Sequence, residues 1–208
     1  MLHPHTELRF ISPQIGYGVV ATRFIPRGTI TWVRCDLDKA FSPRELAEMG
    51  PEYQAILEKY CFRDARGDHI LCWDLARFIN HSCDATCLSP GYNFEVAVRD
   101  LEPGQELTDD YGTLNLDTAF QCLCGSKKCR GTVAPEDVMN QADGWDDRVR
   151  AVFPNLGQVD QPLWAFVREK RAVKQALAQP QTLASCKRHF RLLNGQTARK
   201  SIRLRTVG

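Results

Sequence analysis

The segments "RFINHSCDATC", Arg77 to Cys87, and "QCLCGSKKCRG", Gln121 to Gly131, decide the fold, because the cysteines of neither complete a metal site alone. In the second segment, Cys122, Cys124 and Cys129 follow a CxCx4C spacing. Cysteines two positions apart form a poor disulfide, whereas three thiolates converging on one ion suit zinc. Structural zinc takes four ligands, so the spacing predicts that a distant residue completes the site.

The other cysteines are candidates for the fourth ligand: Cys83 and Cys87 in the first segment, then Cys35, Cys61, Cys72 and Cys186. Spacing alone does not choose among them, and a set of free thiols is the alternative reading. Nine cysteines are an odd number, and the N-terminal "MLHPHTELRF" has neither a basic start nor an apolar stretch. We therefore expect no secretory signal and an intracellular, reducing compartment, cytoplasmic or nuclear.

Charge divides the chain into an acidic body and a basic end. From Arg168 to Gly208 there are eleven Lys or Arg and one acid, whereas the preceding 167 residues carry a net charge of −8. An acidic body favours a basic peptide as partner, and a nucleic acid would bind only through the basic end. No apolar run approaches the length of a membrane span, so we expect no membrane partner. Oligomeric state is not encoded in these patterns.

The first two thirds of the chain predict short strands and two short helices. "LRFIS", "GVVAT", "TITWVRC" and "NFEVAVRD" have strand patterns separated by turn signals. Ser42 and Glu45 in "SPRELAEMG" form a capping-box pattern for a helix that Gly50 ends. A second helix is predicted over 51–59, and "YCFRDARGDHILCW" predicts a hairpin that turns at "ARGD". Beyond Gly131 the pattern is helical, with predicted helices over 135–141, 146–152, 160–178 and 181–194.

Four motifs in order resemble the SET-domain protein lysine methyltransferases: "GYGVVATRFIPRGT", "RFINHSC", "ELTDDYG" and "CLCGSKKCRG". They extend from Ile15 to Gly131, over half of the chain. The resemblance implies a β-rich α+β fold of several small sheets, with a pseudoknot where the NHSC segment passes beneath a loop. It implies a SET domain over 1–118 and a post-SET zinc segment over 119–134. A helical C-terminal segment over 135–195 and a flexible basic tail over 196–208 follow.

The same resemblance assigns ligands for two cofactors. Zinc would be held by Cys83 together with Cys122, Cys124 and Cys129, with Cys87 as the alternative to Cys83. S-adenosylmethionine would bind a set of eight residues drawn from the glycine-bearing motif, the "KYCF" strand and the NHSC segment: Gly16, Tyr17, Gly18, Tyr60, Arg77, Phe78, Asn80 and His81. Glycines in such a motif allow main-chain groups to approach a cofactor closely. Alone, these residues would read as ordinary turn residues.

Tyr111 is the catalytic residue that the resemblance implies, with its hydroxyl where methyl donor and lysine amine meet. The implied reaction is an in-line displacement in which the neutral ε-amine attacks the sulfonium methyl, and positioning and desolvation carry most of the acceleration. This chain departs from the family at Asp109, where Phe or Tyr is usual. That position influences how many methyl groups are added, so the product number stays open. A second departure is Asp84, Ala85 and Thr86 after NHSC, where the family often has an acid, Pro and Asn.

The substrate that the resemblance implies is a histone or histone-like basic peptide. Six acids surround the tyrosine motif and form either a solvated face or a groove for a basic peptide: Asp100, Glu102, Glu106, Asp109, Asp110 and Asp117. "QTARKS", residues 196–201, matches a core histone's amino-terminal tail, which makes Lys200 a candidate for automethylation, with coincidence as the alternative. Two other functions stay open: a SET-fold module that binds a basic peptide with weak catalysis, and a zinc-bearing nucleic-acid protein.

Overall fold

The computed structural model describes residues 1–191 of the 208-residue chain. Four small sheets make up its β structure, as the sequence predicts. The first contains β1 (Thr6–Ser12), β2 (Gly16–Ala21), β10 (Glu106–Asp109) and β7 (Asn80–His81), in that order. The second contains β3 (Ile30–Val33), β9 (Phe94–Ala97) and β8 (Cys87–Leu88). The third contains β4 (Lys39–Phe41), β6 (His69–Leu71) and β5 (Cys61–Arg63), and the fourth pairs β11 (Phe120–Gln121) with β12 (Thr132–Val133).

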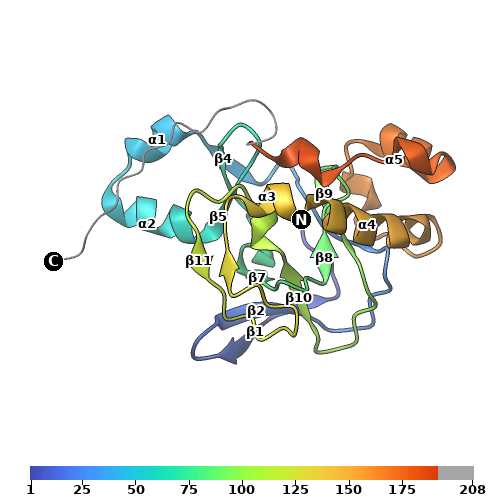
Figure 1. The fold of residues 1–208 in the computed structure, drawn as a ribbon, viewed down its shortest axis with the longest axis horizontal. Coiled ribbons are helices and arrows are strands. Elements are labelled where there is room, and N and C mark those ends of the chain that lie inside the picture. Colours follow the sequence, from blue (N-terminus) through green and yellow to red (C-terminus); the bar gives the residue numbers. More distant parts are fainter. Residues whose placement is uncertain (192–208) are drawn as a thin grey trace.

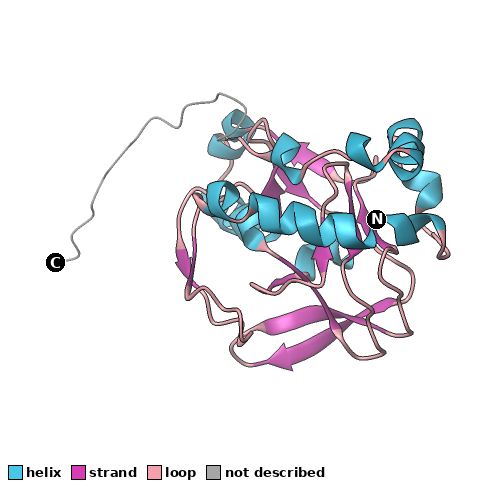
Figure 2. Ribbon diagram, turned by 45° about the vertical axis from the view of Figure 1, so that its right-hand side comes forward, coloured by secondary structure: helices cyan, strands magenta, loops and turns pink. Residues whose placement is uncertain are grey.

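The first sheet lies along one edge of the molecule and the helices lie away from it (Figures 1 and 2). The α-helices are α1 (Pro43–Ala47), α2 (Pro51–Tyr60), α3 (Asp137–Asn140), α4 (Ala142–Val152) and α5 (Lys170–Ala178). Short 3-10 turns are η1 (Leu75–Phe78), η2 (Tyr111–Thr113), η3 (Phe153–Gly157), η4 (Trp164–Phe166), η5 (Pro180–Thr182) and η6 (Cys186–His189). No helix within residues 1–191 is long and apolar enough to cross a bilayer.

Local sequence signals account for α1, α2 and the hairpin. The Ser42 side chain accepts the Glu45 amide and the Glu45 carboxylate accepts the Ser42 amide, which confirms the capping box. Pro51 begins α2, and β5 pairs with β6 across the predicted "ARGD" turn. There Asp64 accepts the amides of Arg66 and Asp68 and so orders the loop.

The helical segment after the zinc motif packs onto the second sheet and does not form a separate core. One apolar cluster joins Ile30 and Phe94 of that sheet to Trp145, Val149 and Phe190 of the C-terminal segment. Burying these large side chains together supplies most of the free energy that holds the segment in place. The pseudoknot and the predicted domain boundaries stay predictions.

Two predicted C-terminal helices are wrong. The helix predicted over 160–178 is interrupted, because Val167 is extended and only α5 is α-helical. Gln161 bonds the amide of Ile30 and the carbonyl of Gly28, so contacts with the second sheet override helix propensity. The helix predicted over 181–194 is replaced, as far as residue 191, by η5 and η6. There Asp146 of α4 accepts the amide of Cys186, which an α-helix would use internally.

Candidate active site

Strand β10 brings the sequence motifs together, because it lies between β2 and β7. Leu107 is in register with Val19 of the glycine motif, and Thr108 pairs with Asn80 in the parallel ladder. The Asn80 amide donates to the Tyr17 carbonyl at 3.1 Å and to the Glu106 carboxylate at 2.7 Å. Three motifs that are up to 90 residues apart in the chain therefore meet at one point.

Gly18 is required at this meeting point. A Cβ atom at Gly18 would lie 2.3 Å from Glu106 Oε1 and 2.7 Å from Asn80 Nδ2, both far inside van der Waals contact. Gly16 has a positive φ of 83°, a backbone conformation that favours glycine, at the start of β2. The glycine pattern of the sequence thus has two distinct physical causes, a close approach and a turn.

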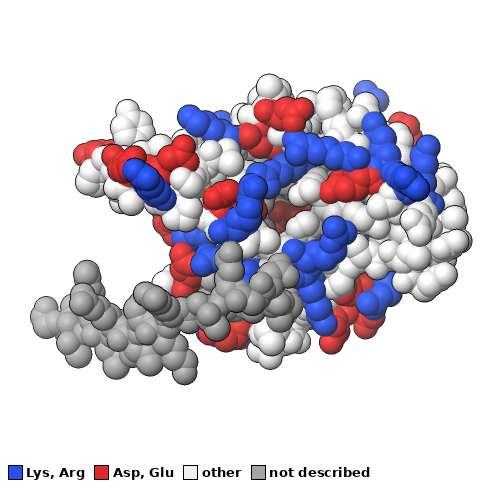
Figure 3. Space-filling model, turned by 90° about the horizontal axis from the view of Figure 1, so that it is seen from above, with Lys and Arg blue, Asp and Glu red and all other residues white. Residues whose placement is uncertain are grey.

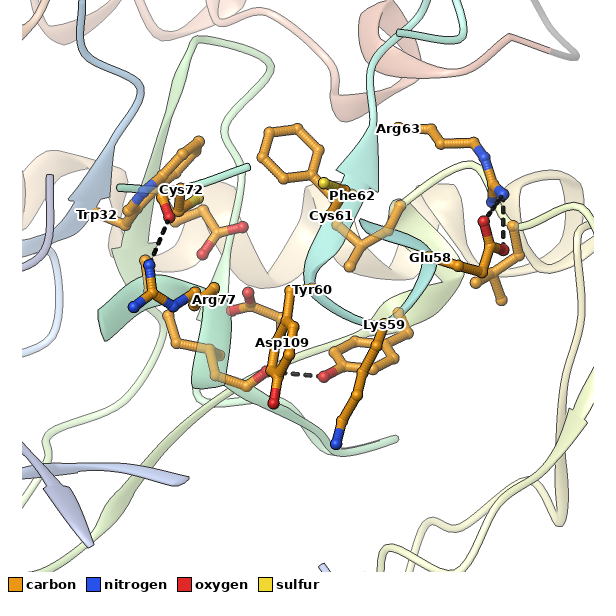
Figure 4. A pocket seen from close by; sticks show the side chains of 16 residues that line it. Trp32, Glu58, Lys59, Tyr60, Cys61, Phe62, Arg63, Cys72, Arg77 and Asp109 are labelled. Carbon is orange, nitrogen blue, oxygen red and sulfur yellow. Dashed lines mark hydrogen bonds and ion pairs between the residues drawn. The ribbon is translucent and has the colours of Figure 1, made fainter. Parts of the chain in front are cut away.

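Of these three strands, only β10 contributes to the wall of a cavity of about 200 Å³, through Asp109. The glycine motif, Asn80 and His81 do not line this cavity. Figure 4 shows Asp109 between Trp32 and Arg77 on one side and Lys59 and Tyr60 on the other. The lining also includes Phe62, Cys72, Ile79, Glu95, Tyr111 and Leu114. Tyr60 and Arg77, two of the predicted cofactor residues, therefore line the cavity. Phe78, a third, contacts Tyr60 edge to face at 5.5 Å and lies under the Arg77 guanidinium.

Tyr111 lines the cavity directly after β10, where the sequence motif places it. Its hydroxyl donates to the Ile79 carbonyl at 2.7 Å, and its backbone amide donates to His81 Nδ1 at 3.1 Å. Burial, together with the nearby Asp109 and Glu106 carboxyls, raises the pKa of Tyr111, so the phenol stays protonated. The side chain is therefore a fixed polar group and not a base at neutral pH.

Asp109 points to the interior and does not turn away into solvent. The residue is half-buried with its Oδ1 atom shielded from solvent, it lines the cavity, and its carboxyl hydrogen-bonds that of Glu95 in β9. Burial, then the neighbouring Glu95, raises the pKa of Asp109 well above its ordinary value, and burial also raises the pKa of Glu95. Sequence reasoning missed Glu95. The available signal was an acid in "NFEVAV", a strand pattern whose four core residues, 94–97, are all buried.

Three of the four cysteines predicted as zinc ligands form one cluster beside Tyr111. The ligand atoms of His81, Cys83, Cys122 and Cys124 all lie within 4.8 Å of one another. The sulfurs of Cys83 and Cys122 are 3.6 Å apart, close to the roughly 3.8 Å between sulfurs of a tetrahedral zinc-thiolate site. Cys129, the fourth predicted thiol, is not in this group, and its sulfur donates to the Cys122 carbonyl at 3.6 Å. The donor set therefore fits zinc.

Two further observations distinguish the cluster from ordinary buried thiols. Burial opposes ionisation of Cys124, but backbone hydrogen bonds from Cys83 and Ser126 lower its pKa to about 7. Cys87, the alternative ligand, lies instead in the apolar cluster around Leu107, and burial raises its pKa. No disulfide joins any of the nine cysteines, all of which lie within the described residues.

His81 connects the thiol cluster to Tyr111. Its Nδ1 accepts the Tyr111 amide, so in the neutral ring the proton lies on Nε2, which faces the Cys83 sulfur at 3.3 Å. Burial lowers the pKa of His81 and favours this neutral form. The Nε2 atom therefore faces the group of sulfurs that Cys83, Cys122 and Cys124 form. The predicted role of His81 as a cofactor contact stays a prediction.

Arg130 lies between Cys129 and Gly131 in the zinc motif and pairs with acidic side chains of the core. Its guanidinium makes a bidentate ion pair with Asp110 at 2.6 and 2.7 Å and contacts Asp137 at 3.0 Å. The Trp145 indole also donates to Asp110, whose side chain is fully buried. Sequence reasoning did not find this network, because its partners come from segments without a shared motif.

The acids around Tyr111 do not form one open groove. Asp110 is buried and Asp109 is half-buried, whereas Asp117 pairs with Arg63 and Arg191. On the face drawn in Figure 3, Lys and Arg side chains alternate with acidic ones. The net negative charge of the body is therefore not concentrated on that face.

Comparison with known proteins identifies the domain that this geometry builds. Residues 16–112 match the family model described as "SET domain". This stretch, just under half of the chain, is similar to SET domains. The match ends one residue after Tyr111 and includes all three motifs that meet on β10. The fold class and the family resemblance read from the sequence are confirmed.

Similar proteins share this region. Histone-lysine N-methyltransferase ASHH2 of Arabidopsis thaliana is 40% identical over 100 residues, 42% of this chain and 5% of that protein. SETD1B of Homo sapiens is 33% identical over 99 residues, again 5% of its length, and TRX1 of Oryza sativa subsp. japonica is 37% identical over 91 residues, 8% of its length. The chain thus spans only a small part of these relatives.

A solved structure, that of KRYPTONITE in complex with mCHG DNA and SAH, has 24% sequence identity and a TM-score of 0.42. The similarity covers 59% of this chain and 27% of that one.

Proposed function

We propose that the chain is a protein lysine N-methyltransferase that uses S-adenosylmethionine. The observation that carries the proposal is the meeting of Gly18, Asn80 and Tyr111 around β10, beside a cavity of about 200 Å³. The names of the relatives, all histone-lysine N-methyltransferases, support the same reaction class and a histone-like basic substrate. A histone substrate also favours the nucleus as the site of action.

S-adenosylmethionine would supply a methyl group on a positively charged sulfur. Main-chain groups of 16–18, the side chain of Asn80 and the cavity residues Tyr60 and Arg77 would hold it. The Ile79 carbonyl fixes the Tyr111 hydroxyl, so this group can orient the substrate amine without reorganising during the reaction. The apolar part of the lining, which includes Phe62, Ile79 and Leu114, would lower the pKa of a lysine amine and favour the neutral nucleophile.

Zinc would be held by Cys83, Cys122, Cys124 and Cys129. Four thiolates fill a tetrahedral site, so the ion would act structurally and not in the chemistry. Its effect on the reaction would be indirect, because Cys83 accepts from His81 and His81 accepts from the backbone of Tyr111. The site would therefore fix the segment that carries the catalytic tyrosine.

Mass spectrometry of the zinc-loaded protein, incubated with S-adenosylmethionine and a histone-tail peptide, tests this function. We expect mass steps of one methyl group on a peptide lysine, absent with Tyr111→Phe, and the number of steps gives the product number. If no peptide from the four core histones gains a methyl group while the Tyr111→Phe variant still binds the cofactor normally, the histone-directed assignment is wrong.

Lys200 lies outside the described residues, and we propose it as a site of automethylation because of the sequence around it. Methyl incorporation into the protein itself should fall in Lys200→Arg, and unchanged incorporation would reject this site.

A second candidate is a SET-fold module that binds a basic peptide without efficient catalysis, and the carboxyl at Asp109 is the observation that favours it. Peptide binding without methyl transfer at any pH would select this candidate. Nucleic-acid binding through the basic tail is tested by deleting 196–208 and measuring salt-dependent DNA binding.

A further inference from the structure

The cavity contains a carboxyl oxygen with no hydrogen-bond donor. Asp109 is half-buried, its Oδ1 is shielded from solvent and has no hydrogen-bond partner among the described residues, and the residue lines the cavity. A buried polar atom left without a partner is unfavourable by about 1–3 kcal/mol, so its retention calls for a functional reason. The Trp32 indole N–H, also in the cavity wall, is similarly without a partner.

The other carboxyl of the pair explains how Asp109 is held. Glu95 in β9 is fully buried and hydrogen-bonds Asp109. Ionised carboxylates only accept hydrogen bonds, so one of the two must carry a proton for this bond to exist. Sharing one proton would leave the pair with one negative charge, and the two carboxyls would titrate as a unit.

None of the surrounding titratable groups supplies a positive charge to Asp109 Oδ1. Cys72 and Cys87 face the pair in the interior and are neutral thiols, because burial raises the pKa of each. Tyr111 is neutral for the same reason, and the charge of the adjacent Asp110 is paired with Arg130. Cys61, at the cavity wall, has a pKa raised by burial to about 11.

The cations of the lining are engaged elsewhere. Arg77 donates to the carbonyls of Cys72 and Trp73, and Arg63 pairs with Glu58 and Asp117. The Lys59 ammonium lies over the Tyr60 ring. None of these cations donates to Asp109 Oδ1, so the oxygen is available to a group that enters the cavity.

We propose that Glu95 and Asp109 form a proton-sharing pair that accepts a proton from a primary amine entering the cavity. This role deepens the proposed lysine methyltransferase function and rests on it. One N–H bond of the ammonium breaks and one O–H bond forms on Asp109, so two neutral carboxyls and a neutral amine result. The nitrogen lone pair then forms the N–C bond as the C–S bond to the methyl breaks, with that electron pair leaving on sulfur. The pair returns its proton to solvent when product leaves.

The direction of proton transfer follows from burial. A cavity that excludes water raises the pKa of a carboxyl and lowers that of an amine, so both effects move the proton from nitrogen to oxygen. Asp109 is thus a catalytic residue by this proposal, and Glu95 is a positioning residue that keeps the pair singly charged.

The first test follows the carboxyls directly. n-Butylamine serves as a stand-in for the lysine side chain and n-butanol as the control, and infrared difference spectroscopy records the C=O stretch of protonated carboxyls at pH 7. We expect amine binding to increase this band in the wild type, whereas butanol in the wild type and amine in Asp109→Asn leave it unchanged. Absence of amine binding by calorimetry, no increase in the band, or an equal increase in Asp109→Asn would overturn the proposal.

The second test uses the pH profile of methyl transfer. Removing a proton acceptor should lower kcat/KM of Asp109→Asn about 100-fold or more at pH 7, and the deficit should shrink as pH rises toward the ordinary lysine pKa. Glu95→Gln should move the acidic limb to lower pH, because the remaining Asp109 ionises more easily. Asp147→Asn, an exposed α4 residue, is the matched control.

A deficit of Asp109→Asn that is the same at every pH overturns the acceptor role. If the wild type transfers no methyl group at any pH but still shows the amine-dependent band, the methyltransferase assignment fails and the proton-sharing pair stands.

Discussion

Replacing Arg130 with Met should destabilise the protein strongly, because it removes the only Arg that pairs with Asp110 among residues 1–191. Asp110 has no exposed side-chain surface, and the bidentate bonds are 2.6 and 2.7 Å. Breaking a buried pair by removing one partner leaves an uncompensated charge, which lowers the free energy of unfolding by about 3–5 kcal/mol. With a urea m-value of about 2.5 kcal/mol/M, the unfolding midpoint should fall by about 1.2–2 M.

The assay is urea denaturation, followed by far-UV circular dichroism, of five proteins: the wild type, Arg130→Met, Asp110→Asn, the double variant and one control variant. Asp110→Asn in the Arg130→Met background should recover part of the lost stability, because the unpaired charge is removed. Arg44→Met is the matched control, since its partner Glu48 is exposed, and its effect should stay below about 1 kcal/mol. The reasoning would be refuted if Arg130→Met lowered the free energy of unfolding by less than about 1 kcal/mol. It would also be refuted if the double variant lost more stability than the two single variants lose together.

Three further variants test other parts of the account. Gly18→Ala should weaken S-adenosylmethionine binding at least tenfold by calorimetry, because the added Cβ atom displaces Glu106 and Asn80. Gly144→Ala, whose added Cβ atom would have no neighbour within 4 Å, should leave the affinity unchanged. Equal affinities of the two variants would contradict the close approach at Gly18. Cys124→Ser should lose bound zinc by elemental analysis and Cys35→Ser should keep it; the opposite pattern would misplace the site. Asp109→Asn should raise the free energy of unfolding above pH 4, increasingly with pH, and a pH-independent change would show that the carboxyl is not raised.

The sign of the last prediction follows from proton binding. Burial raises the folded-state pKa of Asp109, so between the ordinary carboxyl pKa near 4 and the folded value the folded protein holds more protons than the unfolded chain. The contribution of Asp109 to the free energy of unfolding is therefore greatest at acidic pH and falls as pH rises through that window. An asparagine has no proton to lose, so its advantage grows with pH.

Short-range sequence patterns made part of this fold predictable. The Ser42 capping box and the turn at 64–68 depend on residues within a few positions of one another, and both form as their patterns predict. The closeness of Cys122 and Cys124 is similarly encoded, because a short loop between β11 and β12 holds both. The fourth cysteine, Cys83, came from the family resemblance and not from spacing.

Other features of the fold depend on contacts between distant segments, and no local sequence pattern predicts them. Glu95 reads as the polar position of an alternating strand, yet both faces of β9 are buried, so its carboxyl is placed against Asp109. The sequence over 160–178 is compatible with a helix. However, Gln161 accepts the Ile30 amide of the second sheet, and Val167 lies in the apolar cluster that includes this sheet. In these places tertiary burial, and not propensity, decides the structure.

The central claim is that β10 assembles the glycine motif, Asn80 and Tyr111 into one cofactor site. Calorimetric titration of S-adenosylmethionine into the zinc-loaded wild type, Asn80→Ala and Asn140→Ala tests it most directly, because Asn140 is an exposed residue of α3, away from β10. The account predicts one bound cofactor per chain, an affinity at least tenfold weaker in Asn80→Ala, and wild-type affinity in Asn140→Ala. No binding by the wild type, or equal binding by all three proteins, would contradict it.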